Sequence, residues 1–241
     1  MRCRVPVNAC SSATDVPAAP TRVAVRVPRA KTRLHVNPLS PALLATPTAP
    51  HWEGLVSDAS LPLHLDLGCA YGELVLALAD LDAGVNFVGV DLRERVLDRG
   101  RALIAARRTR RNAALLSLNI RHPLFLASLL FGYGGPLSTV SVLFPDPWRK
   151  PTERRRRLLQ PELVDAVAGV MPSGGRFVTA TDCEELALEM RAPFEADPQR
   201  WRNVDPAGGF APGSPFPVAT AWESTVMGRA SPTFWTHFQR T

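Results

Sequence analysis

The sequence predicts an α/β domain built on a mostly parallel β-sheet, with an antiparallel hairpin at its C-terminal end. Three observations support this fold class. Short apolar runs alternate with helical patterns from residue 62 to about residue 195, which is typical of βαβ units. A glycine turn follows the first apolar run. The last stretch, 218–240, alternates apolar and polar residues around a turn, which indicates paired antiparallel strands.

The predicted elements follow one another in a regular order. Strands are expected at 63–67, 85–90, 114–118, 140–144 and 176–180. Helices are expected at 74–81, 93–108, 158–171 and from 182 to about 195. The hairpin would join 218–227 to 233–240 through the turn at 228–232. Parallel strands of this kind are joined by right-handed crossovers, so the helices are expected to cover the sheet.

Two segments precede this domain, which is predicted to occupy residues 62–241. Residues 1–30 are rich in Ala, Val, Pro, Ser, Thr and Arg and contain a single acid. They lack the continuous apolar core of a secretory signal, and their composition is typical of an organellar transit peptide. The alternative is a disordered basic arm that stays on the protein. Residues 31–61 are Pro-rich and are expected to wrap the domain with little regular structure.

Charge is distributed unevenly along the chain. The net charge is +6, but residues 1–50 hold seven basic residues and one acid, which leaves 51–241 neutral with 21 of each. Within that neutral part, 93–121 and 149–157 are strongly basic. Two basic blocks can form one positive face that binds nucleic acid, although 93–121 alone is equally typical of a solvated helix surface.

Membrane and metal functions receive no support from the sequence. No apolar run approaches the roughly 20 residues that span a bilayer. The four cysteines form neither a C-x-x-C pair nor a zinc-binding spacing. We therefore expect no membrane insertion, no metal and no disulfide framework, and a reducing compartment fits this cysteine usage.

Four predicted strands end at or near an acid or amide, namely Asp66, Asp91, Asn119 and Asp146. The carboxyl ends of parallel strands meet at one edge of the sheet, where ligands bind. The turn at 68–72 spaces its glycines by four, which differs from the G-x-G-x-x-G that cradles a pyrophosphate. Because S-adenosylmethionine has no phosphate, a glycine turn beside a strand-terminal acid suits this cofactor.

Two of these side chains have an expected partner on such a cofactor. Asp91 lies about 20 residues after the glycine turn, where an acid accepts hydrogen bonds from ribose hydroxyls, and Arg93 lies beside it. Asn119 is placed to offer its amide near the adenine. A cap for the helix at 93–108 is the alternative role for Asp91.

The fourth strand leads into the turn Phe144-Pro145-Asp146-Pro147-Trp148. Each proline fixes its own φ and restricts the residue before it, so Asp146 is expected to be rigid and extended. A rigid carboxylate can accept the N–H and amino hydrogens of guanine, and an aromatic ring can stack on the base. A structural turn with a capping Asp and a buried Trp is the alternative.

The same turn, followed by Arg149-Lys150 and the run Arg154 to Arg157, resembles the tRNA (guanine-N7)-methyltransferase family. The resemblance covers about residues 60–240 and includes the segments 66–73, 87–91, 180–182 and 220–223. Residues 35–40 are similar to the cyanobacterial and plastid branch of that family. The resemblance implies a Rossmann-like class I fold that transfers a methyl group from S-adenosylmethionine to guanine N7 in the variable loop of tRNA. A plastid location is implied, with the mitochondrion or cytoplasm as alternatives.

The resemblance also implies roles for individual residues. The cofactor would be bound by Asp66, Gly68, Asp91, Arg93, Asn119 and Asp146. Asp146 would also be the catalytic acid beside the base. The tRNA would be contacted by Lys150, Thr152, Arg154, Arg155, Arg156, Arg157, Asp182, Thr220 and Glu223. Many family members carry Glu where this chain has Asp66 and Asp91.

Guanine N7 carries a free lone pair and no proton at neutral pH, so no general base is needed. Asp146 is therefore expected to position the guanine and stabilise charge rather than to abstract a proton. Two other functions stay open from the sequence: methylation of an exocyclic amino group in nucleic acid or protein, and a non-catalytic RNA-binding subunit. A monomer and a homodimer both fit the sequence.

Overall fold

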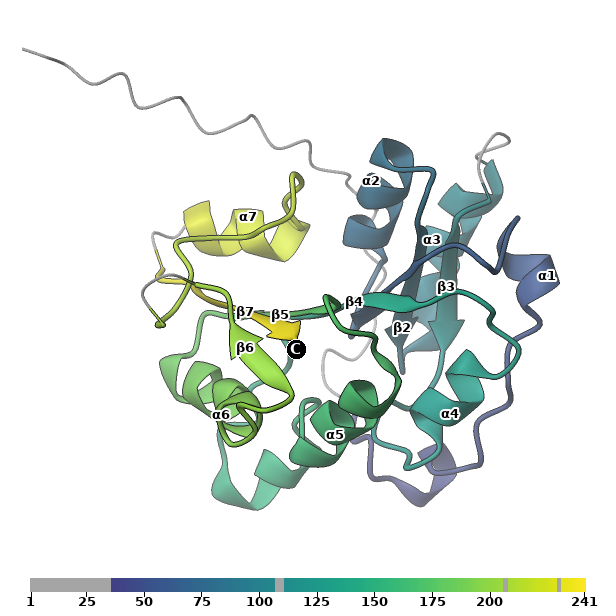
Figure 1. Ribbon diagram of the computed structural model, residues 1–241. Coiled ribbons are helices and arrows are strands. Elements are labelled where there is room, and N and C mark those ends of the chain that lie inside the picture. Colours follow the sequence, from purple (N-terminus) through teal and green to yellow (C-terminus); the bar gives the residue numbers. More distant parts are fainter. Residues whose placement is uncertain (1–35, 107–110, 206–207, 229–230) are drawn as a thin grey trace, which may run out of the picture.

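The computed structural model describes residues 36–106, 111–205, 208–228 and 231–241 (Figure 1). The predicted transit peptide at 1–30 lies outside the described residues, as does the start of the Pro-rich extension. The same holds for the last two residues of the predicted helix 93–108 and for part of the predicted turn at 228–232.

The domain is built on a seven-stranded sheet with the order β3-β2-β1-β4-β5-β7-β6. Its strands are β1 (Leu63–Leu67), β2 (Asn86–Asp91), β3 (Ala113–Ser117), β4 (Leu137–Leu143), β5 (Arg176–Thr181), β6 (Trp201–Asn203) and β7 (Phe234–Arg240). The first five strands pair in parallel, whereas β7 is antiparallel to both β5 and β6. The predicted mostly parallel sheet is confirmed. The chain reverses its direction of winding between β1 and β4, which is where α/β sheets of this type bind ligands.

Helices cover both faces of the sheet (Figure 1). The helices α2 (Glu73–Leu81) and α3 (Glu94–Ala106) lie on one face, and α7 (Ala221–Gly228) lies on the same side as α2. The other face carries α4 (Phe125–Leu130), α5 (Pro161–Val170) and α6 (Glu184–Glu195). Three short helices complete the described chain: η1 (Pro41–Leu43), α1 (Trp52–Leu55) and η2 (Pro151–Arg156).

The C-terminal antiparallel pair is present, but its first strand is β6 and not the predicted 218–227. Most of that segment forms α7, so the strand expected there is wrong. Thr220 Oγ1 accepts the backbone N–H of Glu223 at 3.1 Å, which is one half of an S/T-x-x-E capping box. The cap starts a helix at a place where the apolar alternation alone favoured a strand.

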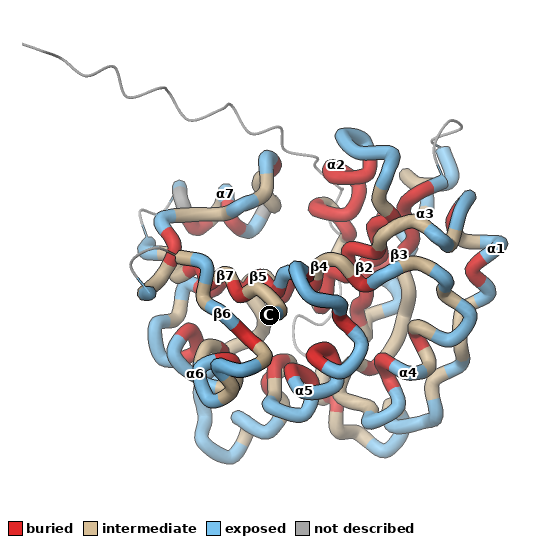
Figure 2. Tube along the Cα trace, viewed as in Figure 1, coloured by how far each residue is buried: buried red, intermediate tan, exposed pale blue. Residues whose placement is uncertain are grey.

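The core fills both faces of the sheet, and Figure 2 shows the buried residues concentrated along the central strands. All residues of β1 and β2 are buried, as expected for parallel strands covered by helices on both sides. At the other edge, Phe194 of α6 stacks on Phe238 of β7 with ring centroids 4.4 Å apart. Trp235 of β7 meets the ring of Phe144 edge-on at 6.0 Å. The antiparallel edge therefore supports the loop that follows β4. None of the described helices is both long and apolar enough to cross a bilayer.

Candidate active site

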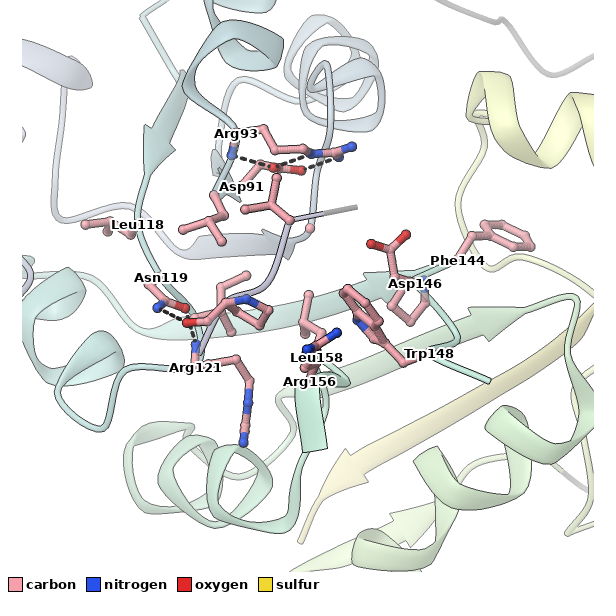
Figure 3. A pocket seen from close by; sticks show the side chains of 16 residues that line it. Asp91, Arg93, Leu118, Asn119, Arg121, Phe144, Asp146, Trp148, Arg156 and Leu158 are labelled. Carbon is pink, nitrogen blue, oxygen red and sulfur yellow. Dashed lines mark hydrogen bonds and ion pairs between the residues drawn. The ribbon is translucent and has the colours of Figure 1, made fainter. Parts of the chain in front are cut away.

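A pocket opens at the carboxyl ends of β1 to β4, and Figure 3 shows the side chains that line it. Its wall is made by the turns that follow these four strands, by Arg156 at the end of η2 and Leu158 after it, and by Val36 and Pro38 of the N-terminal extension. Of the six residues predicted to bind a cofactor, five line this pocket. They are Gly68, Asp91, Arg93, Asn119 and Asp146.

The turn after β1 is fastened to the end of β2. The backbone N–H groups of Gly68 and Cys69 both donate to the Val90 carbonyl, at 2.7 and 3.0 Å. Gly68 has a φ of 82°, and Ala70 adopts the left-handed region with a φ of 49°. The Ala70 N–H donates to Asp91 Oδ2 at 3.1 Å, so the turn and the strand-terminal acid form one unit.

The Asp91 carboxylate accepts four hydrogen bonds. Oδ1 accepts the backbone N–H of Arg93 at 2.8 Å and its Nε–H at 2.9 Å. Oδ2 accepts Arg93 Nη2 at 2.8 Å and the Ala70 N–H at 3.1 Å. A carboxylate offers about four acceptor positions. A further hydroxyl donor therefore reaches Asp91 only if the Arg93 guanidinium turns away.

Asn119 is in the pocket, but its amide does not point to a ligand as the sequence suggested. Its Nδ2 donates to the carbonyls of Pro38 and Leu43, at 2.8 and 2.7 Å. Its Oδ1 accepts the N–H of Arg121 at 3.0 Å. Asn119 therefore fastens the N-terminal extension across the pocket, which makes Val36 and Pro38 part of the wall. The extension was missed as a pocket element because only contacts about 80 residues apart reveal it.

The loop 144–148 is strained at both ends. Phe144 and Trp148 have φ values of 51° and 40°, and with Ala70 they are the non-glycine residues of the described chain in the left-handed region. Such backbone conformations cost about 1–3 kcal/mol each and cluster at functional sites. Asp146, between them, projects its carboxylate into the pocket, whereas the ring of Phe144 points away from it (Figure 3).

The side chains of the run Arg154 to Arg157 point in three directions: to α6, into the pocket and, for Arg155, to solvent. Residues three apart eclipse one another in a 3₁₀-helix, so Arg154 and Arg157 share a face of η2. Both reach glutamates of α6: Arg154 forms ion pairs with Glu185 and Glu189, and so does Arg157. Arg156 turns into the pocket instead, with its guanidinium 5.1 Å from the centroid of the Trp148 ring.

Arg157 is placed differently from the prediction that it contacts tRNA. Its side chain is only 3% exposed. Its Nε donates to the carbonyl of Pro147 at 2.8 Å, so it ties the loop 144–148 to α6. A guanidinium held inside the protein in this way is not available to a phosphate. Arg157 is therefore a brace for the loop.

The remaining predicted tRNA contacts lie outside the pocket lining. Lys150, Thr152, Arg154 and Arg155 are exposed along η2, beside the pocket. Asp182 is exposed just after β5. Thr220 and Glu223 form the cap of α7, and Glu223 is buried.

Asp66, the sixth predicted cofactor residue, is buried behind the turn and does not itself line the pocket. Ser141 Oγ of β4 donates to Asp66 Oδ1 at 2.7 Å. Burial raises the pKa of Asp66 to about 7, against the opposing effect of the Ser141 hydrogen bond and with a further contribution from Asp91. Burial also raises the pKa of the Cys69 thiol, so this cysteine is an unreactive part of the core.

The lining combines charged and apolar side chains, and its charged part holds Arg93, Arg121 and Arg156 besides two acids. Asp91 and Asp146 face the pocket together with Leu118, Ile120 and Leu158. No group of three His, Cys, Asp or Glu side chains suited to a metal ion occurs among the residues that the structure describes. The arrangement suits an organic ligand with hydroxyls, a flat apolar part and groups of both charges.

Comparison with known structures agrees with this fold. The 16S rRNA methyltransferase KamB superposes with a TM-score of 0.52 at 16% identity, over 81% of this chain and 95% of that chain. The antibiotic-resistance methyltransferase Kmr gives 0.50 at 15% identity, over 82% and 96%. The protein therefore has the Rossmann-like fold of the class I methyltransferases, which use S-adenosyl-L-methionine.

Sequence comparison defines the family more narrowly. Residues 60–228 match the family described as "Putative methyltransferase". A tRNA (guanine-N(7)-)-methyltransferase of Synechococcus elongatus is 36% identical over 86% of this chain and 94% of its own length. One of Trichormus variabilis is also 36% identical, over 89% and 98%. The chain belongs to the tRNA (guanine-N7)-methyltransferase family, as the motif at 144–150 predicted.

Proposed function

We propose that this protein transfers the methyl group of S-adenosyl-L-methionine to N7 of a guanine in tRNA, at the variable loop. The observation that carries the proposal is the position of Asp146. Its carboxylate projects into a pocket at the carboxyl ends of β1 to β4, on a loop strained at both ends and braced by Arg157. The family relationship supplies the substrate class.

The residues of the pocket fit S-adenosylmethionine. When bound, this cofactor supplies a methyl group already activated by a positively charged sulfur. Asp91 and Asp146 offer carboxylates to its hydroxyls and positive groups, while Arg93, Arg121 and Arg156 offer guanidinium groups to its carboxylate. Leu118, Ile120 and Leu158 offer apolar surface to the adenine. Asp91 would bind the ribose once Arg93 gives up its two side-chain hydrogen bonds to that carboxylate.

The protein's task in this reaction is to position the base and to exclude water. Guanine N7 already has a lone pair, and nothing has to remove a proton from it. Asp146 accepts hydrogen bonds from the N1–H and amino group of guanine, which directs N7 along a fixed line. Trp148, with Arg156 over its ring, closes the pocket beside Asp146.

The exposed residues of η2 are proposed to contact the tRNA backbone. Lys150 and Arg155 extend to solvent beside the pocket, and neither forms an ion pair within the described part of the chain. We expect the double variant Lys150→Ala/Arg155→Ala to bind tRNA more weakly. The slope of log Kobs against log salt should fall by about one to two, one for each phosphate that the variant no longer neutralises.

The matched control for this measurement is Arg176→Ala. Arg176 is exposed and begins β5, at the end of this strand that lies away from the pocket. Filter binding or fluorescence anisotropy over a salt series measures the slope. A double variant with the wild-type slope would exclude a phosphate role for Lys150 and Arg155.

The proposed function is tested by incubating the protein with unmodified tRNA and radiolabelled cofactor, followed by nucleoside analysis. The expected product is 7-methylguanosine, and chemical cleavage at the modified base should place it in the variable loop. A label in a methylated exocyclic amine would instead support the other enzymatic function. Absence of any transferred label would contradict methyltransferase activity on tRNA.

A plastid location is proposed from the composition of residues 1–30 and from the cyanobacterial relatives. Arg, Ser and Ala without a secretory apolar core are typical of transit peptides. A fluorescent reporter fused behind residues 1–30 should enter plastids. A reporter that stays in the cytoplasm would contradict the proposal.

A further inference from the structure

Three buried polar side chains form a continuous chain between β1 and β4. His64 Nε2 lies 3.0 Å from Ser141 Oγ, and Ser141 Oγ donates to Asp66 Oδ1 at 2.7 Å. The exposed fractions are 5% for His64, 0% for Ser141 and 5% for Asp66. The imidazole of His64 also lies between two aromatic rings, with centroids 5.5 Å from Phe87 and 5.3 Å from Phe216.

The hydrogen bonds define where the protons lie. While Asp66 is ionised, Ser141 donates its only proton to it, so the Ser141 oxygen can only accept from His64. His64 therefore carries a proton on Nε2. Burial lowers the pKa of His64 to about 3, which keeps the ring neutral at physiological pH. This series of hydrogen-bonded side chains ends at the carboxylate of Asp66, two residues before Gly68 of the cofactor turn.

These three side chains are of the residue types found in a serine hydrolase triad, but their hydrogen bonds run in a different order. In a hydrolase the serine donates to the histidine and is open to substrate. Here Ser141 is fully buried and donates to the acid. It therefore cannot act as a nucleophile.

We propose that Ser141 and His64 are positioning residues, which hold the Asp66 carboxylate oriented and ionised for the ammonium group of the cofactor's methionine part. The inference rests on the cofactor role proposed for Asp66. Asp91 from β2 is the ionisable group whose charge raises the pKa of Asp66, and the charges of Asp66, Asp91 and Arg93 all act on the Cys69 thiol of the turn. The described chain places no cation in hydrogen-bond contact with Asp66, so the positive charge of the ammonium group would balance this carboxylate from the pocket side of the turn.

The pH dependence has a definite sign. Burial places the pKa of Asp66 near 7, so the free protein holds a proton there at lower pH. A cationic ligand must displace this proton, which weakens binding up to about tenfold for each pH unit below that pKa. Affinity should therefore rise as the pH increases through 7 and level off above it. Removing the Ser141 hydrogen bond raises the pKa of Asp66 further and moves this transition to higher pH.

The test compares two ligands by isothermal titration calorimetry from pH 6 to pH 9, without tRNA. S-adenosylmethionine carries the ammonium group, and 5′-methylthioadenosine lacks it together with the carboxylate and the sulfonium charge. For Ser141→Ala we expect the affinity for S-adenosylmethionine to fall on the order of tenfold at pH 7 and to approach the wild-type value at pH 9. The affinity for 5′-methylthioadenosine should not change. His64→Phe keeps the ring between Phe87 and Phe216 and should shift the profile in the same direction, by less.

Thr179→Val is the matched control. Thr179 and Thr236 form a buried hydroxyl pair at 2.6 Å between β5 and β7, so the variant loses a buried hydrogen bond of the same sheet. It should leave the pH profile in place. Equal weakening at every pH, or weakening for both ligands, would show that Ser141 is merely structural and overturn the proposal. A wild-type protein that fails to bind S-adenosylmethionine at any pH would instead contradict the proposed function.

Discussion

Asp146→Asn is expected to lower kcat for tRNA methylation by about two to three orders of magnitude. The substitution keeps the size of the side chain and replaces one acceptor oxygen by an amino group. Guanine presents two donors, N1–H and the exocyclic amino group, to this position. In the variant, the amide N–H of the asparagine would face one of these guanine donors, and neither could accept a hydrogen bond. An enzyme site built to hydrogen-bond its substrate loses much of its rate when such a partner is lost. The base would then be held away from its line of approach.

Cofactor binding should be affected much less, because Asp91 and the turn after β1 are not changed. We expect the dissociation constant for S-adenosylmethionine to change by about threefold or less, in keeping with the loss of one rim interaction. Single-turnover methyl transfer gives the rate and calorimetry gives the affinity. Asp165→Asn, on the exposed side of α5, is the matched control for loss of a carboxylate.

Two results would contradict a positional role for Asp146. A variant with wild-type turnover would show that the carboxylate does not hold the guanine. A parallel loss of turnover and of cofactor affinity would show that Asp146 acts through the cofactor. A wild-type kcat that stays constant between pH 6 and pH 9 would support the absence of a general base.

The strands and the residues at their ends were predictable because both depend on local pattern. Apolar runs followed by Asp91, Asn119 and Asp146 lie at one edge of any parallel sheet with short turns. The segment 218–227 was misread for the same reason. Its apolar alternation and its Thr220–Glu223 cap are both local signals, and they favour different structures. Packing of β7 between β5 and β6 decided between them.

The roles of Asn119 and Arg157 could not be predicted, because their partners are distant in the sequence. Asn119 is 81 residues from Pro38, and Arg157 is 32 residues from Glu189. A polar side chain at a strand end can donate the same hydrogen bonds to a ligand or to a carbonyl of its own chain. Only the three-dimensional path of the N-terminal extension and of α6 distinguishes the two. The strain at Phe144 and Trp148 is likewise set by the closed fold.

Arg157→Met is expected to destabilise the protein by about 3 kcal/mol, because breaking a buried ion pair leaves a charge and a carbonyl without partners. The carbonyl is that of Pro147 and the charge is that of Glu189. Glu189 is 41% exposed, so water compensates part of its loss and the lower end of the usual range applies. For a chain of this size, a loss of about 3 kcal/mol lowers Tm by roughly 6–12 °C.

Arg154→Met provides a close control, since Arg154 lies on the same face of η2 and pairs with the same two glutamates. It is 43% exposed, and exposed pairs contribute about 1 kcal/mol or less. Thermal and urea unfolding should therefore separate the two variants clearly. Similar small losses for both would show that burial of Arg157 contributes nothing beyond its ion pairs.

Arg157→Met should also lower kcat at temperatures where the variant is fully folded. The guanidinium holds the Pro147 carbonyl, and Pro147 follows Asp146 in a loop whose two end residues have positive φ. Without that hydrogen bond the loop can relax toward unstrained backbone, and the Asp146 carboxylate loses its fixed direction. A displacement of about 1 Å far from the chemistry can reduce a rate by about a hundredfold. A variant that is less stable but fully active when folded would show that the strained loop holds its geometry without the brace.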